Sequence, residues 1–273
     1  MNVPSPASSP ATAKSPARRG RTLAVTSGKG GVGKTLVAAN LAAALTRQGQ
    51  RVLVIDADLG LANLDVLLNL KPKLTLHDVF TGKASLDEAI LDAPGGFQVL
   101  LAGSGLVEYS RLSAQVREQL KTLLQTVRPR YDLILLDTGA GISDVVLYAV
   151  SLADEVLVIA TSEPTSLADA YATMKVLASQ QQRSRLQLLV NQCRHPGEGR
   201  EVHQQLQTVL DRFVQLPSGG LIQLDLIGEL PTDPSVREAV QRRKLLLRLY
   251  PGTPASVALR SAADRLLAMT GHD

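Results

Sequence analysis

Short apolar runs alternate with longer amphipathic stretches from Arg21 to the end of the chain. The runs are the length of buried strands, and the stretches between them repeat apolar residues at helical spacing. This alternation predicts an α/β fold, a single doubly wound, mostly parallel sheet with helices on both faces. Strands are expected at Thr22–Thr26, Val52–Asp56, Gln98–Leu101, Leu133–Asp137, Glu155–Ala160, Leu186–Asn191 and Leu224–Gly228.

Helical stretches separate and follow these strands. Seven strands suit one doubly wound domain, so residues 21–273 are assigned to a single folded unit. The helices are expected at Lys34–Gln48, Arg111–Val127, Ser143–Ser151, Thr165–Gln180, Glu198–Phe213, Pro234–Tyr250 and Pro254–Met269.

The first 20 residues differ in composition from the rest of the chain. They contain four Pro, four Ser and four Ala, a mixture that buries too little apolar surface to offset the entropy of ordering. We therefore predict a disordered, basic tail at residues 1–20. Arg and Ser without acids are also typical of an organelle transit peptide, but a solvated tail is the simpler interpretation.

The formal net charge of +4 arises from this end of the chain. Residues 1–21 hold Lys14, Arg18, Arg19 and Arg21 and no acid, so the remainder carries 25 basic and 25 acidic residues. The chain also has only eight aromatic residues on which bases could stack. A neutral body that is poor in aromatic residues does not favour direct binding of nucleic acid.

Cysteine content and the length of the apolar runs indicate a cellular setting. The single cysteine, Cys193, cannot form an internal disulfide, a multi-cysteine zinc site or an iron–sulfur site within one subunit. The runs Leu133–Leu136 and Val156–Ala160 are far shorter than the roughly 18 residues of a membrane-spanning helix. A cytoplasmic protein is therefore expected.

A glycine-rich loop follows the first expected strand and precedes the first expected helix. It matches G-x-x-x-x-G-K-[ST], in which glycines let backbone N–H groups surround phosphate oxygens at a helix N-terminus. The Lys of the motif suits the β- and γ-phosphates and its Thr suits Mg²⁺. A plain turn would not need this Lys-Thr pair, so the loop predicts binding of ATP with Mg²⁺ through Gly28, Lys29, Gly30, Gly31, Val32, Gly33, Lys34 and Thr35.

Three aspartates follow or end strands at the edge of the sheet where ligands bind in open α/β folds. Asp56 and Asp137 end the second and the most apolar strand, and both suit the Mg²⁺ shell together with Thr35. Asp58 lies just beyond and could orient the attacking water. For each acid taken alone, capping of the strand end is the alternative. The nearby phosphate-binding loop favours a role in Mg²⁺ binding or in hydrolysis instead.

The second lysine of the loop, Lys29, carries a resemblance to a known family. Taken alone it suits a solvated loop position, because a nucleotide bound to its own subunit does not need it. The loop GKGGVGKT, however, resembles the deviant Walker A motif of the MinD/ParA group of P-loop ATPases. The resemblance implies an ATP-sandwiched homodimer in which Lys29 reaches the partner's phosphates and joins Lys34 and Asp58 in catalysis.

Longer segments resemble a narrower group, the flagellar-number regulators FlhG and FleN. The similarity extends from about Thr22 to Met269, nearly the whole chain outside the tail. The segments are DADLGLANLDVLLNL (56–70), TLHDV (75–79), LLDTGAGIS (135–143), SEPTSLADAYATMKVL (162–177) and AVQRRKLLLRLYPGTPASVAL (239–259).

This resemblance implies a function, partners and further site residues. The implied protein is an ATPase that dimerises on ATP, leaves the dimer on hydrolysis and limits flagellar number. Its implied partners are the flagellar GTPase FlhF and either a transcriptional activator or flagellar switch proteins. Asn191, Pro231 and Asp233 lie where such an ATPase holds adenine.

Both ends of the chain bear on these partners. Many relatives carry an N-terminal DQA-x-x-LR helix that stimulates FlhF, and residues 1–20 lack it. The basic tail either contacts acidic surfaces or nucleic acid, or only keeps the protein soluble. Near the other end, Arg242, Arg243, Lys244 and Arg248 surround leucines that packing against the sheet would explain. The chain stops at Asp273, so no separate membrane-targeting helix is expected, although peripheral contact with the inner membrane or a cell pole is an alternative.

Three other functions share the same loop. A division-site or partition ATPase is the main alternative, although partition would call for a basic DNA-binding face that the neutral body does not predict. A cluster-carrier ATPase would need paired cysteines. A tyrosine kinase of this type would end in a tyrosine-rich tail, whereas this chain ends in MTGHD.

Overall fold

The computed structural model describes residues 20–58, 63–103, 113–217 and 219–269. Within these ranges eight strands form one sheet in the order β3-β4-β2-β5-β1-β6-β7-β8, and only β3 and β4 pair antiparallel. The predicted doubly wound sheet is confirmed. The strands are β1 (Arg21–Ser27), β2 (Val52–Ala57), β3 (Ile90–Asp92), β4 (Gln98–Leu100), β5 (Leu133–Ala140), β6 (Glu155–Ala160), β7 (Arg185–Cys193) and β8 (Gln223–Pro231).

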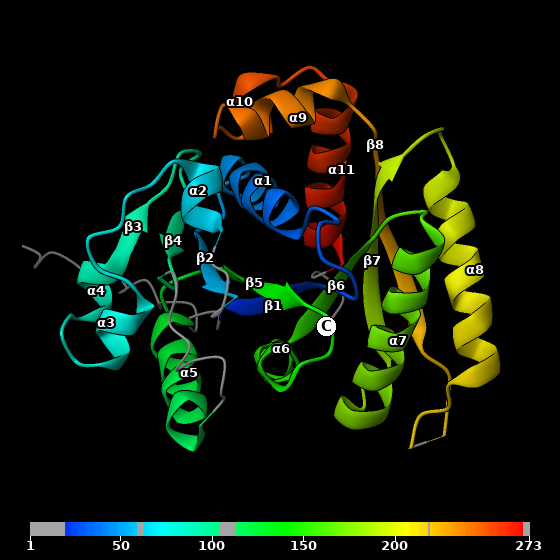
Figure 1. Ribbon diagram of the computed structural model, residues 1–273, viewed down its shortest axis with the longest axis horizontal. Helices are drawn as coiled ribbons and strands as arrows, with labels where there is room; N and C mark the ends of the chain where they lie inside the picture. Colours follow the sequence, from blue (N-terminus) through cyan, green and yellow to red (C-terminus); the bar gives the residue numbers. More distant parts are fainter. Residues whose placement is uncertain (1–19, 59–62, 104–112, 218, 270–273) are drawn as a thin grey trace, which may run out of the picture.

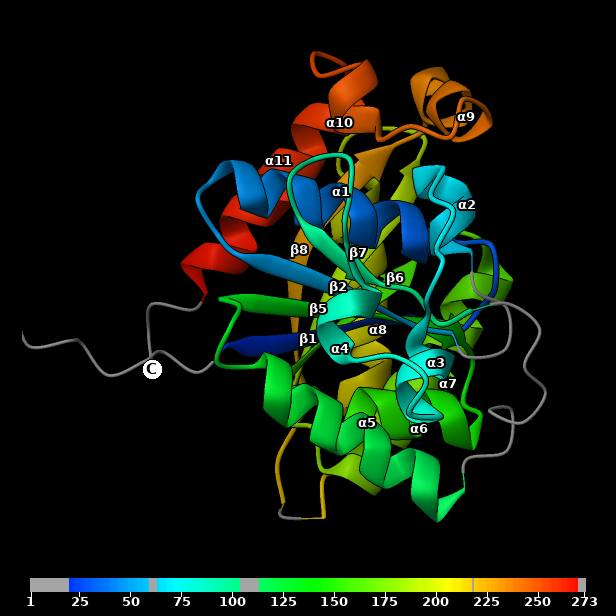
Figure 2. The same cartoon turned by 90° about the vertical axis from the view of Figure 1, so that its left-hand side faces the viewer.

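Helices cover both faces of the sheet, and each face has its own apolar core. The upper face in Figure 1 carries α1 (Lys34–Arg47), α2 (Leu64–Leu68), α9 (Pro234–Gln241), α10 (Leu246–Leu249) and α11 (Pro254–Ala268). Figure 2 shows the same layers from the side, with α5 and α6 below the sheet. The remaining helices are α3 (Leu76–Phe80), α4 (Leu86–Ala89), α5 (Ala114–Val127), α6 (Asp144–Ser151), α7 (Pro164–Gln181) and α8 (Glu198–Phe213).

Helix α1 is buried almost all the way round, with ten consecutive buried residues from Leu36 to Leu45. Its sequence of Ala and Leu permits this because small and apolar side chains pack against the sheet on one side and α11 on the other. The helix that begins at the glycine-rich loop is therefore held firmly at the centre of the upper layer.

All seven predicted strands are present, and the differences lie in short elements. The edge strand β3 and the helices α2, α3 and α4 were not predicted. The single helix expected over Pro234–Tyr250 is broken, because Arg243 adopts a left-handed conformation with φ of 50°. Gly20, assigned to the tail, is buried and donates its N–H to the carbonyl of Arg128 at 2.9 Å. The rest of the predicted tail lies outside the described residues.

The carboxyl ends of β1, β2 and β5 meet at one edge of the sheet. Because the three strands are parallel neighbours, the loops that follow them share this edge. Asp56 on β2 is in register with Asp137 on β5, so the two predicted carboxylates lie side by side. None of the helices in the described ranges is long and apolar enough to cross a membrane.

Candidate active site

The loop Gly28–Thr35 needs glycine for reasons of space and backbone conformation. Gly31 and Gly33 have φ of 78° and 97°, which side chains disfavour. A Cβ at Gly28 would lie 2.2 Å from the carbonyl oxygen of Asp169, so the loop packs directly on the backbone of α7. The loop is thus shaped by close packing as well as by the turn into α1.

Lys34 and Thr35 begin α1, where the helix dipole favours an anion. Burial lowers the pKa of Lys34, and the nearby carboxylates of Asp137 and Asp58 oppose this effect. The Thr35 hydroxyl hydrogen-bonds to the Asp137 carboxylate. The first turn of α1 therefore presents a desolvated ammonium group beside two acids.

Asp56 and Asp137 are both almost fully buried. Burial raises the pKa of Asp137 to about 7, although the Thr35 hydroxyl and Lys34 oppose the rise. Burial, together with the charge of Asp137, raises the pKa of Asp56 well above its usual range. Oδ2 of Asp56 and Oδ1 of Asp137 are buried without a hydrogen-bond partner. Such oxygens are costly in a folded protein unless a hydrogen-bond donor or a cation reaches them.

Strand β5 continues three residues beyond Asp137, so this acid does not end its strand as predicted. The extension brings Gly139 opposite Asp58: a Cβ on Gly139 would lie 3.5 Å from Oδ1 of Asp58. Gly141, with φ of 87°, donates its N–H to the carbonyl of Ser27 at 2.8 Å. The loop after β5 is thereby tied to the start of the glycine-rich loop.

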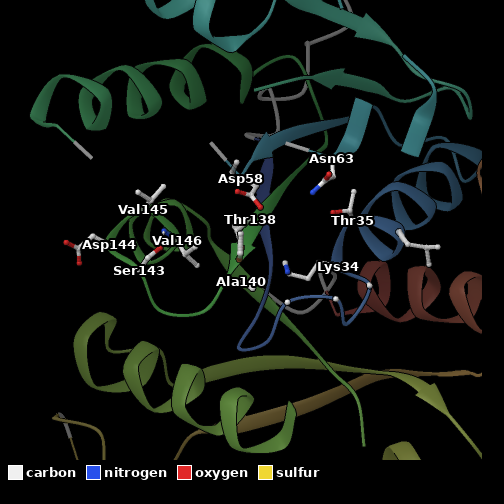
Figure 3. Close-up of a pocket in the computed structure, with 16 residues that line it drawn as sticks. Lys34, Thr35, Asp58, Asn63, Thr138, Ala140, Ser143, Asp144, Val145 and Val146 are labelled. Carbon is white, nitrogen blue, oxygen red and sulfur yellow. Dashed lines mark hydrogen bonds between the residues drawn. The ribbon is translucent and has the colours of Figure 1, made fainter. Parts of the chain in front are cut away.

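A cavity of about 890 Å³ lies beside these groups (Figure 3). Asp56 and Asp137 do not line it themselves, but their chain neighbours Ala57 and Thr138 do. Gly30, Gly31, Gly33, Lys34, Thr35 and Asp58 line it, which brings most of the predicted phosphate-binding residues together. The sequence analysis missed other residues that line the cavity. Ser143, which caps α6, could have been suspected from its position, whereas the involvement of Asn63 and Thr138 depends on tertiary packing. The added residues are Leu36, Ala57, Asn63, Thr138, Gly139, Ala140, Ser143, Asp144, Val145 and Val146.

Lys29 points away from this cavity, toward the start of α7. Its Nζ lies 2.8 Å from Oε2 of Glu163 and 2.8 Å from Oγ1 of Thr165. Their side chains remain solvent-accessible, at 36% for Lys29 and 61% for Glu163. Lys29 is therefore held at the surface by an exposed ion pair.

The predicted adenine-binding residues have structural partners. Asn191 donates to the carbonyl of Val32 at 2.8 Å and accepts from the N–H of Gln192 at 2.9 Å. The carboxylate of Asp233 caps α9 through Ser235 and also accepts the N–H of Ala255 at 3.2 Å. Pro231 ends β8 beside Cys193 of β7. None of the three residues lines the cavity of about 890 Å³. Their contact with adenine stays a prediction.

The donor atoms at the cavity fit Mg²⁺. Asp56 and Asp137 supply carboxylate oxygens, two of them without partners, and Thr35 supplies a hydroxyl. Mg²⁺ prefers such oxygen ligands and usually keeps water and substrate phosphates as the others. In the described part of the chain, no group of three or more His, Cys, Asp or Glu has the arrangement of a metal site.

Comparisons with known proteins identify the family. Residues 20–190 match the model of the AAA domain. The antiactivator FleN of Pseudomonas aeruginosa is 41% identical over 244 residues, covering 89% of this chain and 85% of FleN. The chain belongs to the MinD/ParA family of P-loop ATPases.

Two further proteins that are similar to this chain carry names that refer to different cellular processes. The flagellum site-determining protein YlxH of Helicobacter pylori is 31% identical, covering 90% of this chain and 81% of YlxH. The structure of the septum site-determining protein MinD of Pyrococcus horikoshii in complex with Mg-ADP has a TM-score of 0.72 at 26% identity. It covers 92% of this chain and 97% of that MinD. The family thus includes proteins named for flagella and for septum placement.

Proposed function

We propose that this chain is an ATP-dependent, dimerising switch ATPase that regulates flagellar number or placement and flagellar gene expression. The observation that carries the proposal is the similarity to the antiactivator FleN over nearly the whole chain. The similarity to YlxH, a flagellum site-determining protein, supports the same role. The intact two-lysine loop supports control by ATP.

In this proposal the cavity holds the phosphates of ATP. The N–H groups of the loop and the charge of Lys34 bind phosphate oxygens, and Thr35, Asp56 and Asp137 hold Mg²⁺, directly or through water. Bound Mg²⁺ would neutralise charge on the phosphate oxygens. Asp58 lies next to Gly139, near the carboxyl end of β5, and orients the attacking water.

Lys29 serves assembly in the same proposal. It lies outside the cavity of its own subunit, and its ion pair with Glu163 is exposed. An exposed pair of this kind contributes only about 0–1 kcal/mol, so Lys29 can exchange Glu163 for a phosphate of the partner subunit at small cost. ATP binding would then favour a homodimer, and hydrolysis would release it.

A role in flagellar regulation calls for partner proteins that belong to the flagellar system. The word antiactivator in the name of FleN supports a transcriptional activator as one partner of this chain. FlhF and flagellar switch proteins are the others that we propose, acting in the cytoplasm, with a cell pole as the place where flagellar position is set.

Two experiments test the proposal. Purified protein should release phosphate from ATP and should dimerise with ATP but not with ADP, as measured by light scattering. Deleting the gene should change the number of flagella, counted by electron microscopy, while septum placement stays normal. Minicells with unchanged flagella would instead assign the chain to division, and absence of nucleotide binding would refute the switch.

A further inference from the structure

A second hollow region lies on the upper face of the sheet, away from the phosphate cavity. Two adjoining hollows of about 380 and 530 Å³ share Arg248 and meet at the neighbours Pro94 and Gly95. Their lining residues come from the end of α2, the loop before β4 and the segment that contains α10. Figure 2 shows α2 and α10 together above the sheet. We call this elongated feature the basic groove.

Four cations line the basic groove, namely Arg47, Arg243, Lys244 and Arg248. No acidic residue is among the described residues that line either hollow. Nor does any of these four cations form an ion pair with a described carboxylate. The neighbouring Arg242, by contrast, pairs with Glu238. The groove therefore carries a local charge of +4 in a body that is neutral as a whole.

The walls of the groove are apolar. Pro94, Leu70 and Leu249 line the hollow of about 380 Å³, and Leu68, which is 2% exposed, closes its floor as part of the core. The other leucines of the basic segment, Leu245 to Leu247, are at most 1% exposed. They pack in the core, as the sequence analysis expected, and are not available to enter a bilayer.

We propose that the basic groove binds an acidic segment of a protein partner, with one apolar side chain seated between the partly buried Leu70 and Leu249. Charge complementarity carries this assignment, since three cations without an ion-pair partner among the described residues line the hollow that holds Leu70 and Leu249, and Arg47 lines the adjoining one. The concave, elongated shape suits an extended or helical peptide better than a flat lipid surface. Among the described residues that line the groove none is aromatic, which disfavours the stacking of nucleic-acid bases there.

Both walls of the groove are connected to the phosphate cavity. On one side, Asp56 accepts a hydrogen bond from the backbone N–H of Leu64, the first residue of α2. The other end of α2 contributes lining residues to the groove. On the other side, Asn40 of α1 accepts the backbone N–H of Leu247 at 3.1 Å and donates to the carbonyl of Leu36 at 2.9 Å. Occupation of the groove is therefore coupled to nucleotide binding. This second half of the inference rests on the proposed nucleotide site, whereas peptide binding does not.

Selection from a displayed library of short random peptides tests the first half. The full chain is the bait. A counter-selection against the variant Lys244→Gln/Arg248→Gln discards peptides that bind elsewhere on the protein. The selected peptides should contain several Asp or Glu around one Leu, Ile or Phe. Peptides without acids, or peptides that bind the variant equally well, would overturn the proposal.

Fluorescence anisotropy with a labelled selected peptide gives the size of the effect. Lys244→Gln/Arg248→Gln should weaken binding about tenfold, because each exposed charge contact is worth up to about 1 kcal/mol. Replacing the apolar anchor of the peptide by Ser should also weaken binding, with the protein unchanged. Lys121→Gln/Arg212→Gln is the matched control, since α5 and α8 carry these exposed cations on the opposite face. Equal loss in this control would refute the groove as the site.

Two further measurements distinguish the remaining outcomes. If vesicles containing phosphatidylglycerol bind the wild type but not Lys244→Gln/Arg248→Gln, the cations serve a lipid surface and the peptide proposal fails. For the coupling, saturating peptide should change the affinity for Mg-ADP, and Mg-ADP should change the affinity for the peptide by the same factor. Unchanged affinities would refute the coupling alone, whereas no ADP binding without peptide would refute the proposed function and leave the groove intact.

Discussion

The two lysines of the glycine-rich loop have opposite surroundings. Lys34 is half-buried beside Asp137 and Asp58, and this partial burial lowers its pKa. Lys29 lies at the surface, where it contacts Glu163 and Thr165. One loop thus presents one lysine to its own cavity and another to the outside.

The comparison teaches how each charge can be used. Lys34 lies in a partly buried group in which the charges of Asp137 and Asp58 affect it, because electrostatic interactions are stronger away from bulk water. An anion that enters this group would gain a strong contact. Lys29 has a weak, solvent-screened partner, so it can change partners at little cost. The inner lysine therefore suits binding and the outer lysine suits assembly, and four substitutions test this division.

The largest effect is expected from Asp58→Ala, in the inner group. Loss of a residue that positions water should slow hydrolysis on the order of 100- to 10,000-fold, while nucleotide binding persists. The ATP-bound dimer should then be long-lived. Phosphate release and light scattering measure both quantities. Asp144→Asn is the control, because Asp144 is an exposed acid that lines the same cavity; equal slowing in both variants would mean that only the charge of the cavity matters.

Lys34→Ala should weaken ADP binding roughly 100-fold, since a buried, charge-assisted contact to phosphate is worth up to about 3 kcal/mol. Isothermal titration with Mg-ADP measures this loss, and dimerisation should be lost with it. The exposed Lys175 of α7 supplies the control Lys175→Ala. Normal ADP affinity in Lys34→Ala would show that the buried lysine does not face the phosphates.

The sequence predicted the inner group better than the outer one. Lys34 and Thr35 lie in a motif and Asp56 and Asp137 lie near the carboxyl ends of their strands, and parallel pairing brings such positions together. The contact between Lys29 and Glu163 could not be predicted, because it joins two loops whose approach depends on the packing of Gly28 against α7.

The short elements and the break in the helix expected over Pro234–Tyr250 also could not be predicted from the pattern of apolar residues. Strand β3 has three residues, too few for a period of two to be recognised. Arg243 interrupts the last basic segment in a conformation that usually signals Gly or Asn, and neither residue stands there. The basic groove depends on this break and on α2, so no sequence pattern indicated it.

Lys29→Ala should separate binding from assembly. ADP affinity should stay within about twofold of the wild type, because the side chain lies outside the cavity of its own subunit. ATP-dependent dimerisation should weaken roughly 30-fold or more, since a charge buried between two subunits would be lost. Light scattering over a range of protein concentrations measures the change. A variant that dimerises normally on ATP would assign Lys29 to the surface alone.

The smallest effect is expected from Glu163→Gln. Glu163 precedes α7 but makes no capping hydrogen bond with its side chain, so the substitution removes charge without removing a cap. Release of Lys29 should then cost less, and ATP-dependent dimerisation should strengthen by up to about fivefold, as an exposed ion pair is worth up to about 1 kcal/mol. The same substitution in a Lys29→Ala background should have no effect, because the pair is already broken. An equal gain in both backgrounds would mean that Glu163 acts through general charge, and a weaker dimer would mean that Glu163 itself belongs to the interface.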